Sequence, residues 1–222
     1  MDDTIAKEHR LRVTEIYASV QGESLHAGKP CVFVRLTGCN LRCTWCDSTF
    51  TFTGGVHRDW REVAEEAHAF GIHTVELTGG EPLVQRNAIP LMARLLELGH
   101  EVLLETSGSR SLEDVPAGVH VICDLKPPDS GEERANLWSN VELLKPTDEV
   151  KLVLASRRDY EWARDVIRQH DLGSRVAAVQ LSPVWGALDP ADLATWLVED
   201  RLPARLQLQL HKVVWDPEAR GV

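Results

Sequence analysis

The chain has 222 residues, of which 43% are hydrophobic and 26% charged, and its formal net charge is -10. This composition is typical of a globular protein and excludes a disordered one. The acidic balance disfavours nucleic acid as a partner, because binding to phosphates relies on clustered Lys and Arg. The start of the chain lacks the apolar stretch of a signal peptide, and no segment offers the roughly 20 apolar residues of a membrane helix. We therefore expect a single cytoplasmic domain over residues 1–222, without membrane contact.

Short apolar runs rich in Val, Ile and Leu alternate with segments of helical periodicity, which is the pattern of repeated strand-helix units. Strands are predicted at 12–20, 31–38, 74–80, 101–108, 119–126, 149–156, 175–184 and 205–215. Helices are predicted at 59–70, 85–99, 158–170 and 189–200, two of them starting with a helix-capping Asp. Residues 127–148 are expected to be mostly loop with one short helix. The pattern predicts the α/β fold class.

Five of the predicted strands end in small, polar or charged residues. These ends are "TGCN", "TGGEP", "ETSG", "DLKPP" and "QLSPV". In a curved parallel sheet the loops after the carboxyl ends of the strands meet at one rim, where ligands bind. The sequence therefore predicts one shared site at this rim.

Three of the five cysteines lie close together in "GCNLRCTWCDSTF", residues 38–50, as Cys39-x3-Cys43-x2-Cys46. In a reducing compartment such a group indicates metal binding more than disulfides. Thiolate ligands favour zinc, copper(I) or an iron-sulfur cluster. A structural zinc site would be closed by a fourth ligand.

Neither of the two remaining cysteines is placed to supply that ligand. Cys31 begins a strand that ends near Cys39, so the two Cα atoms are on the order of 20 Å or more apart. In strand 119–126 the alternation places Cys123 on the face opposite to Asp124 and Lys126. We expect both cysteines to be small buried hydrophobes. A site with three cysteines and an open position is a catalytic arrangement.

The cysteine motif, with Trp45 just before its last cysteine, resembles the cluster motif of the radical S-adenosylmethionine (SAM) superfamily. "LTGGEP" (77–82), "ETSG" (105–108) and "DLK" (124–126) follow in the order found there. The resemblance implies that three thiolates hold a 4Fe-4S cluster whose fourth iron chelates SAM. It also implies that an electron from the cluster cleaves SAM into methionine and a 5'-deoxyadenosyl radical.

The same resemblance implies a fold and a set of SAM contacts. The expected fold is a trimmed partial (β/α)6 barrel in which loops replace some helices. The exposed backbone beside Gly79 and Gly80 is expected to let the methionine moiety of SAM approach closely. The implied SAM-binding residues are Trp45, Cys46, Asp47, Gly80, Ser107, Asp124, Leu125 and Lys126.

Residues 15–50, "TGGEPLVQ" (78–85), "VQLSPV" (179–184) and "LQLHKVVW" (208–215) further resemble the 7-carboxy-7-deazaguanine synthases, a family in the route to queuosine. The resemblance implies hydrogen abstraction from C6 of 6-carboxy-5,6,7,8-tetrahydropterin, ring contraction and loss of ammonia. It also implies a homodimer and an electron donor such as flavodoxin. A flat pterin needs a few fixed polar groups in an enclosed pocket, and Arg35 is the natural partner of its carboxylate. The expected substrate-binding residues are Val20, Gln21, Gly22, Glu23, Arg35, Thr78, Gln180 and His211.

In this family a hydroxyl residue two positions after the last cysteine helps to bind Mg2+, a cation that requires oxygen ligands. Here that residue is Ser48, where Thr is frequent, and Thr49 is the alternative ligand. The C-terminal tail 213–222 is expected to cover the site or a dimer interface.

Two other interpretations are open at this point. One is a glycyl-radical enzyme activase, which does not explain "SVQGES" or "LQLHK". The other is a non-enzymatic zinc or iron-sulfur module with an unidentified fourth ligand, which explains neither the open position nor "TGGEP".

Overall fold

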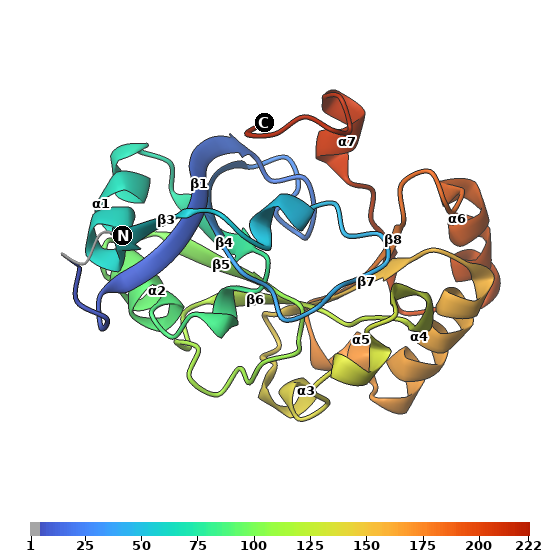
Figure 1. The fold of residues 1–222 in the computed structure, drawn as a ribbon. Coiled ribbons are helices and arrows are strands. Elements are labelled where there is room, and N and C mark those ends of the chain that lie inside the picture. Colours follow the sequence, from blue (N-terminus) through green and yellow to red (C-terminus); the bar gives the residue numbers. More distant parts are fainter. Residues whose placement is uncertain (1–4) are drawn as a thin grey trace.

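The computed structural model describes residues 5–222, and the nine strands in this range form one curved sheet (Figure 1). The strands are β1 (Arg10–Val20), β2 (Pro30–Leu36), β3 (Val56–Asp59), β4 (Thr74–Gly79), β5 (Glu101–Thr106), β6 (His120–Asp124), β7 (Glu149–Leu154), β8 (Ala178–Pro183) and β9 (Arg205–Leu206). Their order is β3-β1-β2-β4-β5-β6-β7-β8-β9. Neighbours from β2 to β9 are parallel, whereas β1 runs antiparallel to β2 and β3. The sheet is therefore open, and the carboxyl ends of its parallel strands share one rim.

Helices follow most of the parallel strands. They are α1 (Trp60–Ala69), α2 (Ala88–Glu97), α3 (Asn140–Leu143), α4 (Arg157–Gln169), α5 (Leu172–Arg175), α6 (Pro190–Glu199) and α7 (Leu210–Val214). Three of them begin at side chains that accept a hydrogen bond from the first turn, namely Asp59, Ser156 and Asp189. The helices α1 to α6 lie around the outside of the sheet, whereas α7 and the C-terminus lie on the other side (Figure 1). Within residues 5–222, no helix combines the length and apolar character needed to cross a membrane.

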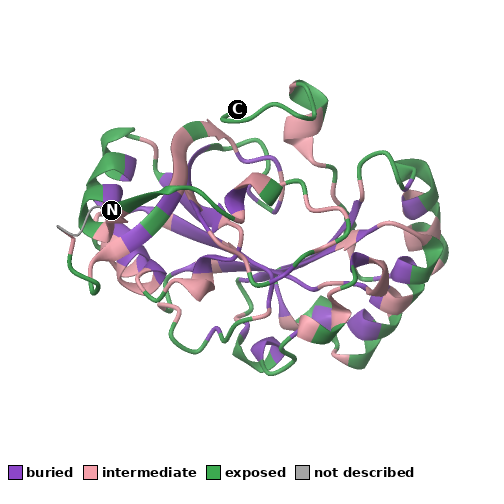
Figure 2. Ribbon diagram, in the orientation of Figure 1, coloured by how far each residue is buried: buried purple, intermediate pink, exposed green. Residues whose placement is uncertain are grey.

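Strand β4 shows how the sequence separates the two faces of the sheet. Val75 and Leu77 belong to the hydrophobic core that the sheet shares with the helices. Glu76 and Thr78 point the opposite way and line a cavity. Figure 2 shows the strands buried at the centre of the molecule, with exposed residues mainly on the outer helices and loops. The inner face of this parallel sheet is thus polar although it is buried, and the cavity lies over this polar face.

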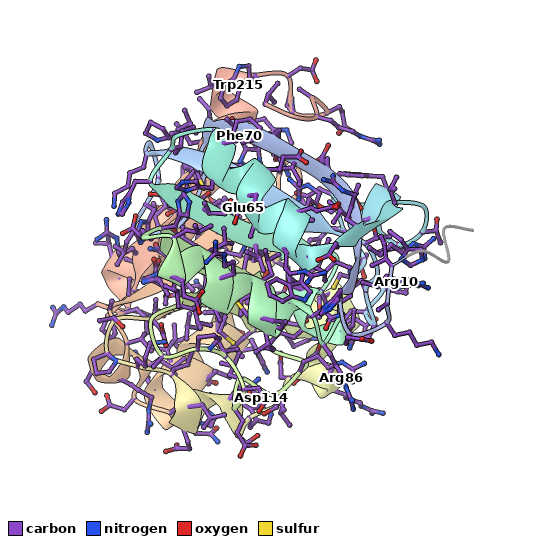
Figure 3. All side chains as sticks on the ribbon, turned by 90° about the vertical axis from the view of Figure 1, so that its left-hand side faces the viewer. Arg10, Glu65, Phe70, Arg86, Asp114 and Trp215 are labelled. Atoms are coloured by element: carbon purple, nitrogen blue, oxygen red, sulfur yellow. The ribbon has the colours of Figure 1, made fainter. Side chains whose placement is uncertain are left out.

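The helices on the outer face complete the core. Leu91, Met92 and Leu95 of α2 and Tyr160 of α4 are fully buried against the outward-facing strand residues. In the view of Figure 3, Glu65 and Phe70 mark α1 on the outside of the molecule, and Trp215, which follows α7, lies at the top.

The predicted α/β class is confirmed. Residues 127–148 are mostly loop, as expected, with the short helix α3 and two 3-10 turns at Pro128–Ser130 and Glu133–Ala135. The predicted strand 205–215 is wrong beyond Leu206. Only Arg205 and Leu206 pair with β8, and the chain then forms α7. The reason is that the amide of Leu210 donates to the carbonyl of Gly22 at 2.8 Å, which draws the chain across the sheet and away from its edge. Strand β3 and helix α5 were not predicted.

Leu152 on β7 offers a test of the outward-facing core. Its replacement by Ala is expected to lower the free energy of unfolding by about 2–5 kcal/mol, because the helices cannot fully collapse onto the space it leaves. Urea denaturation followed by circular dichroism measures this change. Val198→Ala, on the exposed side of α6, is the control and should stay within about 0.5 kcal/mol of the parent chain. Equal effects of the two substitutions would contradict the assignment of faces.

Candidate active site

A cavity of about 610 Å³ lies over the polar inner face of the sheet. Such a volume is typical of a small-molecule site. Most of the predicted site residues line it together: Val20, Gln21, Gly22, Glu23, Arg35, Cys39, Cys43, Trp45, Cys46, Asp47, Ser48, Thr78, Gly80, Ser107, Asp124, Lys126 and His211. Thr49, the alternative to Ser48, also lines it. Residues separated by as many as 191 positions, from Val20 to His211, therefore meet at one place, at the rim that the strand ends predicted.

Two of the predicted residues are not among those lining the cavity. Leu125 is buried, and its amide donates to the carbonyl of Lys151 at 2.8 Å. Gln180 is also buried, and its amide nitrogen donates to Glu149 at 2.9 Å, near the amino end of β7. In this structure Gln180 therefore faces a different polar cluster.

The three motif cysteines differ from the other two in their surroundings. Cys39, Cys43 and Cys46 are half-buried and line the cavity. Cys31 and Cys123 are buried, and Cys123 lies in the core between sheet and helices, where burial raises the pKa of its thiol to about 12. The expectation that these two are small buried hydrophobes is confirmed.

Asp124 lines the cavity together with the three motif cysteines. Its Oδ1 is buried without a hydrogen-bond partner in the described part of the chain, so this cavity wall offers an acceptor to a ligand.

Gly79 and Gly80 have a packing role in addition to the SAM contact that is expected of their backbone. Gly79 has a φ of 134°, and a Cβ there would collide with the backbone of Leu36. A Cβ on Gly80 would collide with Gly38 and with Cβ of Cys39. Glycine is therefore required at both positions so that the end of β4 can pack closely against residues 38–50, the cysteine loop. Both glycines line the cavity, and the approach of SAM to their backbone stays a prediction.

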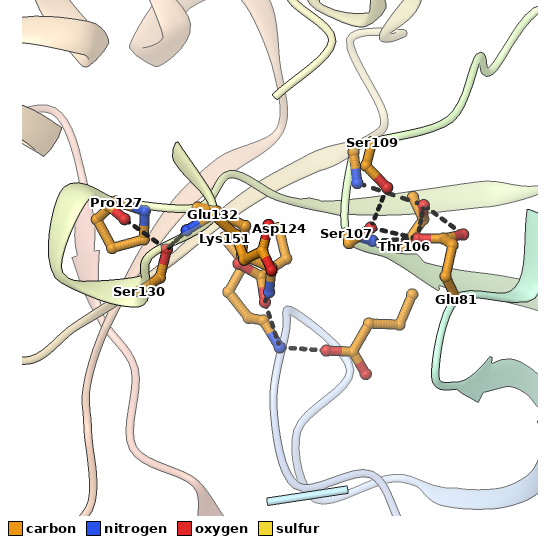
Figure 4. A network of polar contacts seen from close by, with 12 residues as sticks. Glu81, Thr106, Ser107, Ser109, Asp124, Pro127, Ser130, Glu132 and Lys151 are labelled. Atoms are coloured by element: carbon orange, nitrogen blue, oxygen red, sulfur yellow. Dashed lines mark hydrogen bonds and ion pairs between the residues drawn. The ribbon is translucent and has the colours of Figure 1, made fainter. Parts of the chain in front are cut away.

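Glu81 joins the ends of β4 and β5 beneath the cavity. Its carboxylate is fully buried and accepts hydrogen bonds from the hydroxyl of Thr106 at 2.9 Å and from the amide of Ser107 at 2.7 Å. Figure 4 shows Glu81 reaching both residues, with Ser109 beside them. Ser107 thus has a fixed position in the cavity wall.

Lys151 on β7 is the centre of an ion-pair network on the inner face (Figure 4). Its ammonium group contacts the carboxylate of Glu105, lies 3.0 Å from Glu23 and lies 3.7 Å from Asp124. Burial lowers the pKa of Lys151, but these carboxylates raise it well above the ordinary value, so the lysine is charged. Asp124 also pairs with Lys126 at 2.9 Å.

Glu76 lies deeper in the same face and is fully buried against Gln21. Burial and the nearby Glu105 raise the pKa of Glu76 well above its ordinary range. Burial raises the pKa of Glu105 as well, but Lys151 outweighs this and lowers it. The two carboxyl groups therefore differ in how readily they are protonated, and only a protonated carboxyl group can donate a hydrogen bond.

Arg35 is held in the cavity wall by two neighbours on β1. Its Nε donates to Glu15 at 2.8 Å, and Nη2 donates to the hydroxyl of Tyr17 at 2.7 Å. A guanidinium has five N–H donors, so these bonds fix its plane and leave donors for an anion. The ring of Phe50, in the cysteine loop, lies 5.8 Å from the guanidinium carbon.

The C-terminal segment closes one side of the cavity, since residues 216–222 contribute to its lining. Lys212 of α7 pairs with Asp47 at 2.9 Å, and the guanidinium of Arg220 lies 4.1 Å from the ring centre of Phe50. Partial desolvation raises the pKa of Asp47, whose side chain is still 53% exposed, but Lys212 and the hydroxyl of Ser48 outweigh this and lower it to about 2. His211 lies on α7 against Gly22, and not on a strand as predicted. The tail therefore covers the site, the first of the two roles expected for it, and its place in a dimer interface stays a prediction.

Sequence reasoning missed several cavity residues that the structure brings together: Glu15, Tyr17, Glu76, Glu105 and Lys151. Each occupies an inward position of a strand. A signal was present, because polar residues at every second position of "TVELTG" and "EVKLVL" interrupt otherwise apolar runs.

Known proteins resemble this chain at the level of both sequence and fold. The Radical SAM superfamily profile matches residues 33–124. A 7-carboxy-7-deazaguanine synthase from Koribacter versatilis is 47% identical over 96% of this chain and 100% of its own length. One from Chlorobaculum tepidum is 42% identical over 98% of this chain and 100% of its own.

Among solved structures, that of QueE from Escherichia coli superposes with a TM-score of 0.74 at 22% identity, covering 92% of this chain and 96% of that one. This likeness supports the partial-barrel fold, with an open sheet. The relatives favour neither the activase nor the metal-binding module. The chain belongs to the 7-carboxy-7-deazaguanine synthase family of the radical SAM superfamily.

Proposed function

We propose that this chain converts 6-carboxy-5,6,7,8-tetrahydropterin to 7-carboxy-7-deazaguanine with loss of ammonia, as a radical SAM enzyme. The observation that carries the proposal is that the three motif cysteines line the same cavity as Arg35 and the polar groups around Lys151. A cluster site and a site for a flat, polar, anionic molecule are thereby joined in one enclosed space.

Cys39, Cys43 and Cys46 would hold a 4Fe-4S cluster, and Trp45, Asp47, Gly80, Ser107, Asp124, Leu125 and Lys126, with Cys46, would contact SAM. When bound, the cluster and SAM supply the one-electron chemistry that removes hydrogen from substrate carbon. The free acceptor Oδ1 of Asp124 supports a donor group of SAM beside it. Leu125 would contribute through its backbone, since its side chain is buried.

The substrate would lie between Arg35 and the network around Lys151. Arg35 would pair with the carboxylate through donors that Glu15 and Tyr17 leave unused. Val20, Gln21, Gly22, Glu23 and Thr78 surround the same space, and His211 closes it from α7. Glu76, whose raised pKa favours the protonated form, and Glu105, whose lowered pKa favours the ionised form, match a heterocycle that both accepts and donates hydrogen bonds. Gln180 would reach the substrate only if its side chain left Glu149.

Mg2+ is part of the proposal, with Ser48 as its protein ligand. The hydroxyl of Ser48 lines the cavity and donates to Asp47 at 3.1 Å. A Mg2+ ion keeps most of its ligands as water and substrate oxygen, so one protein hydroxyl is compatible with binding. Thr49 is the alternative ligand.

The chain would act as one radical SAM domain over residues 1–222. By family resemblance alone, it would form a homodimer and receive electrons from a donor such as flavodoxin. A cytoplasmic location agrees with the metal-binding role proposed for the three motif cysteines.

The proposed reaction is tested by anaerobic reconstitution and incubation with SAM, a reductant and carboxytetrahydropterin. Formation of 7-carboxy-7-deazaguanine, measured by mass spectrometry, is the expected result. SAM cleavage without this product would favour another radical SAM reaction such as that of an activase. A protein that never cleaves SAM would be a metal-binding module.

Replacing any one of Cys39, Cys43 and Cys46 by Ala should abolish cluster binding, because only three thiolates are available. Iron analysis and the visible absorption of the reconstituted protein measure the loss, and product formation should disappear with it. Cys123→Ala is the matched control and should retain iron, since Cys123 faces the helices. Loss of iron in the control together with retained iron in the motif variants would contradict the assignment.

Arg35→Lys should lower kcat/KM for the carboxytetrahydropterin by about 10- to 100-fold, because a lysine keeps the charge and loses paired hydrogen bonding. The measurement is steady-state kinetics with saturating SAM. Arg58→Lys, which alters an exposed ion pair with Glu66, should leave kcat/KM unchanged. A similarly small effect of both substitutions on kcat/KM would contradict the assignment of Arg35 to substrate binding.

Ser48→Ala should raise the Mg2+ concentration for half-maximal activity by about tenfold or more, because the loss of one ligand contact weakens Mg2+ binding. Ser48→Thr should behave like the parent chain, because it retains the hydroxyl. Titration of Mg2+ at fixed substrate measures the shift. If Thr49→Ala shifts the midpoint and Ser48→Ala does not, the ligand is Thr49.

A further inference from the structure

A second cluster of metal-ligating side chains lies away from the cavity, at the amino ends of the parallel strands. In the described part of the chain, His26, His120 and Glu149 have ligand atoms that all lie within 4.8 Å of one another. His120 begins β6 and Glu149 begins β7, whereas His26 comes from the loop 21–29 between β1 and β2. None of the three lines the cavity. The cluster therefore lies outside the cavity, and Gln180, which donates to Glu149, is the residue named for the proposed substrate site that contacts it.

We propose that His26, His120 and Glu149 form a binding site for a divalent transition-metal ion, with Zn2+ the best match, which fastens loop 21–29 to the strands beneath it. Two imidazoles and one carboxylate are a common ligand set for zinc, with water at the fourth position. This proposal does not depend on the identity of the substrate.

The geometry at His120 and Glu149 fits shared coordination. Nε2 of His120 lies 2.9 Å from Oε1 of Glu149. Two ligand atoms bound to one zinc at about 2.0–2.1 Å, at angles of about 90–110°, are about 2.8–3.4 Å apart. The second oxygen of Glu149 accepts from Gln180 at 2.9 Å, so the carboxylate is held in place while Oε1 faces the imidazole.

The surroundings of His26 leave its other nitrogen for a metal. Nδ1 lies 3.4 Å from a carboxylate oxygen of Glu101 and 3.2 Å from the ammonium group of Lys29. Nε2 is therefore the nitrogen that can bind the ion, with Nδ1–H directed at Glu101, which is the usual support of a metal-bound histidine. Lys29 would move aside from Nδ1, as its side chain is half exposed. Thr74 orients Glu101 through a hydrogen bond of 2.8 Å.

The ion would hold a loop that also serves the cavity. Two backbone hydrogen bonds of 2.8 Å close the base of the loop. The backbone N–H of Gln21 donates to the carbonyl of Lys29, and the backbone carbonyl of Gln21 accepts from the N–H of Gly28. Glu149 also accepts from the amide of Leu25 at 3.0 Å. Gln21 and Glu23 line the cavity from the same loop. A metal at its far side would therefore position these residues without touching the substrate.

Zinc analysis of the anaerobically reconstituted enzyme tests the proposal, because the iron-sulfur cluster then occupies the motif cysteines. After dialysis with Zn2+ and removal of loose metal, about one zinc per chain is expected in addition to the iron. His120→Gln should lose this zinc with its iron content and circular dichroism unchanged. Glu101→Gln, which changes no ligand, should weaken zinc binding by about 10- to 100-fold.

His68→Gln is the matched control, since His68 pairs with His100 at 2.9 Å outside the cluster and should leave zinc binding unchanged. Hydrogen exchange gives an independent readout, because the amide of Leu25 should exchange faster in His120→Gln or after chelation. Absence of bound zinc in the parent enzyme would overturn the proposal and leave a hydrogen-bonded cluster. Zinc that persists in His120→Gln would overturn it as well.

Discussion

The site depends on the ion pairs that the buried ammonium group of Lys151 makes with the carboxylates around it. A charge inside a protein is tolerated only when it is paired, and removal of one partner of a buried ion pair costs about 3–5 kcal/mol. Lys151 satisfies this requirement with Glu23, Glu105 and Asp124. These carboxylates come from the loop after β1 and from the ends of β5 and β6. One lysine thereby connects the walls proposed for substrate and for SAM.

This network is possible because the two faces of the sheet carry different residues. Outward positions such as Val75, Leu104 and Leu152 form a continuous core with the helices. Inward positions carry ionisable groups that would be costly in a core and are useful in a cavity. The open sheet leaves this inner face accessible, and the cysteine loop and the C-terminal segment cover it. The alternation of apolar and polar residues along the strands therefore produces both the hydrophobic core and the polar lining of the cavity.

Much of this arrangement was predictable from sequence, for identifiable reasons. The motif around Cys39 and the polar strand ends are local patterns, and their convergence follows from the geometry of parallel strands. Glu76 and Lys151 were missed because a polar residue in an apolar strand shows alternation without showing which face encloses a cavity. The helix carrying His211 depends on a contact with Gly22, some 190 residues earlier, which no local pattern in "LQLHKVV" contains. The two glycines of "TGGEP" were located correctly, but their first role in backbone packing appears only when the strands are assembled.

In the proposed function, the cysteine motif and the polar inner face act on one substrate in one cavity. Incubation of the reconstituted enzyme with SAM and carboxytetrahydropterin deuterated at C6 is a direct test, because it follows a single atom from the substrate to the cofactor. We expect deuterium at the 5' carbon of the adenosyl group together with 7-carboxy-7-deazaguanine. Formation of the deazaguanine without transfer of deuterium to the adenosyl group would contradict it.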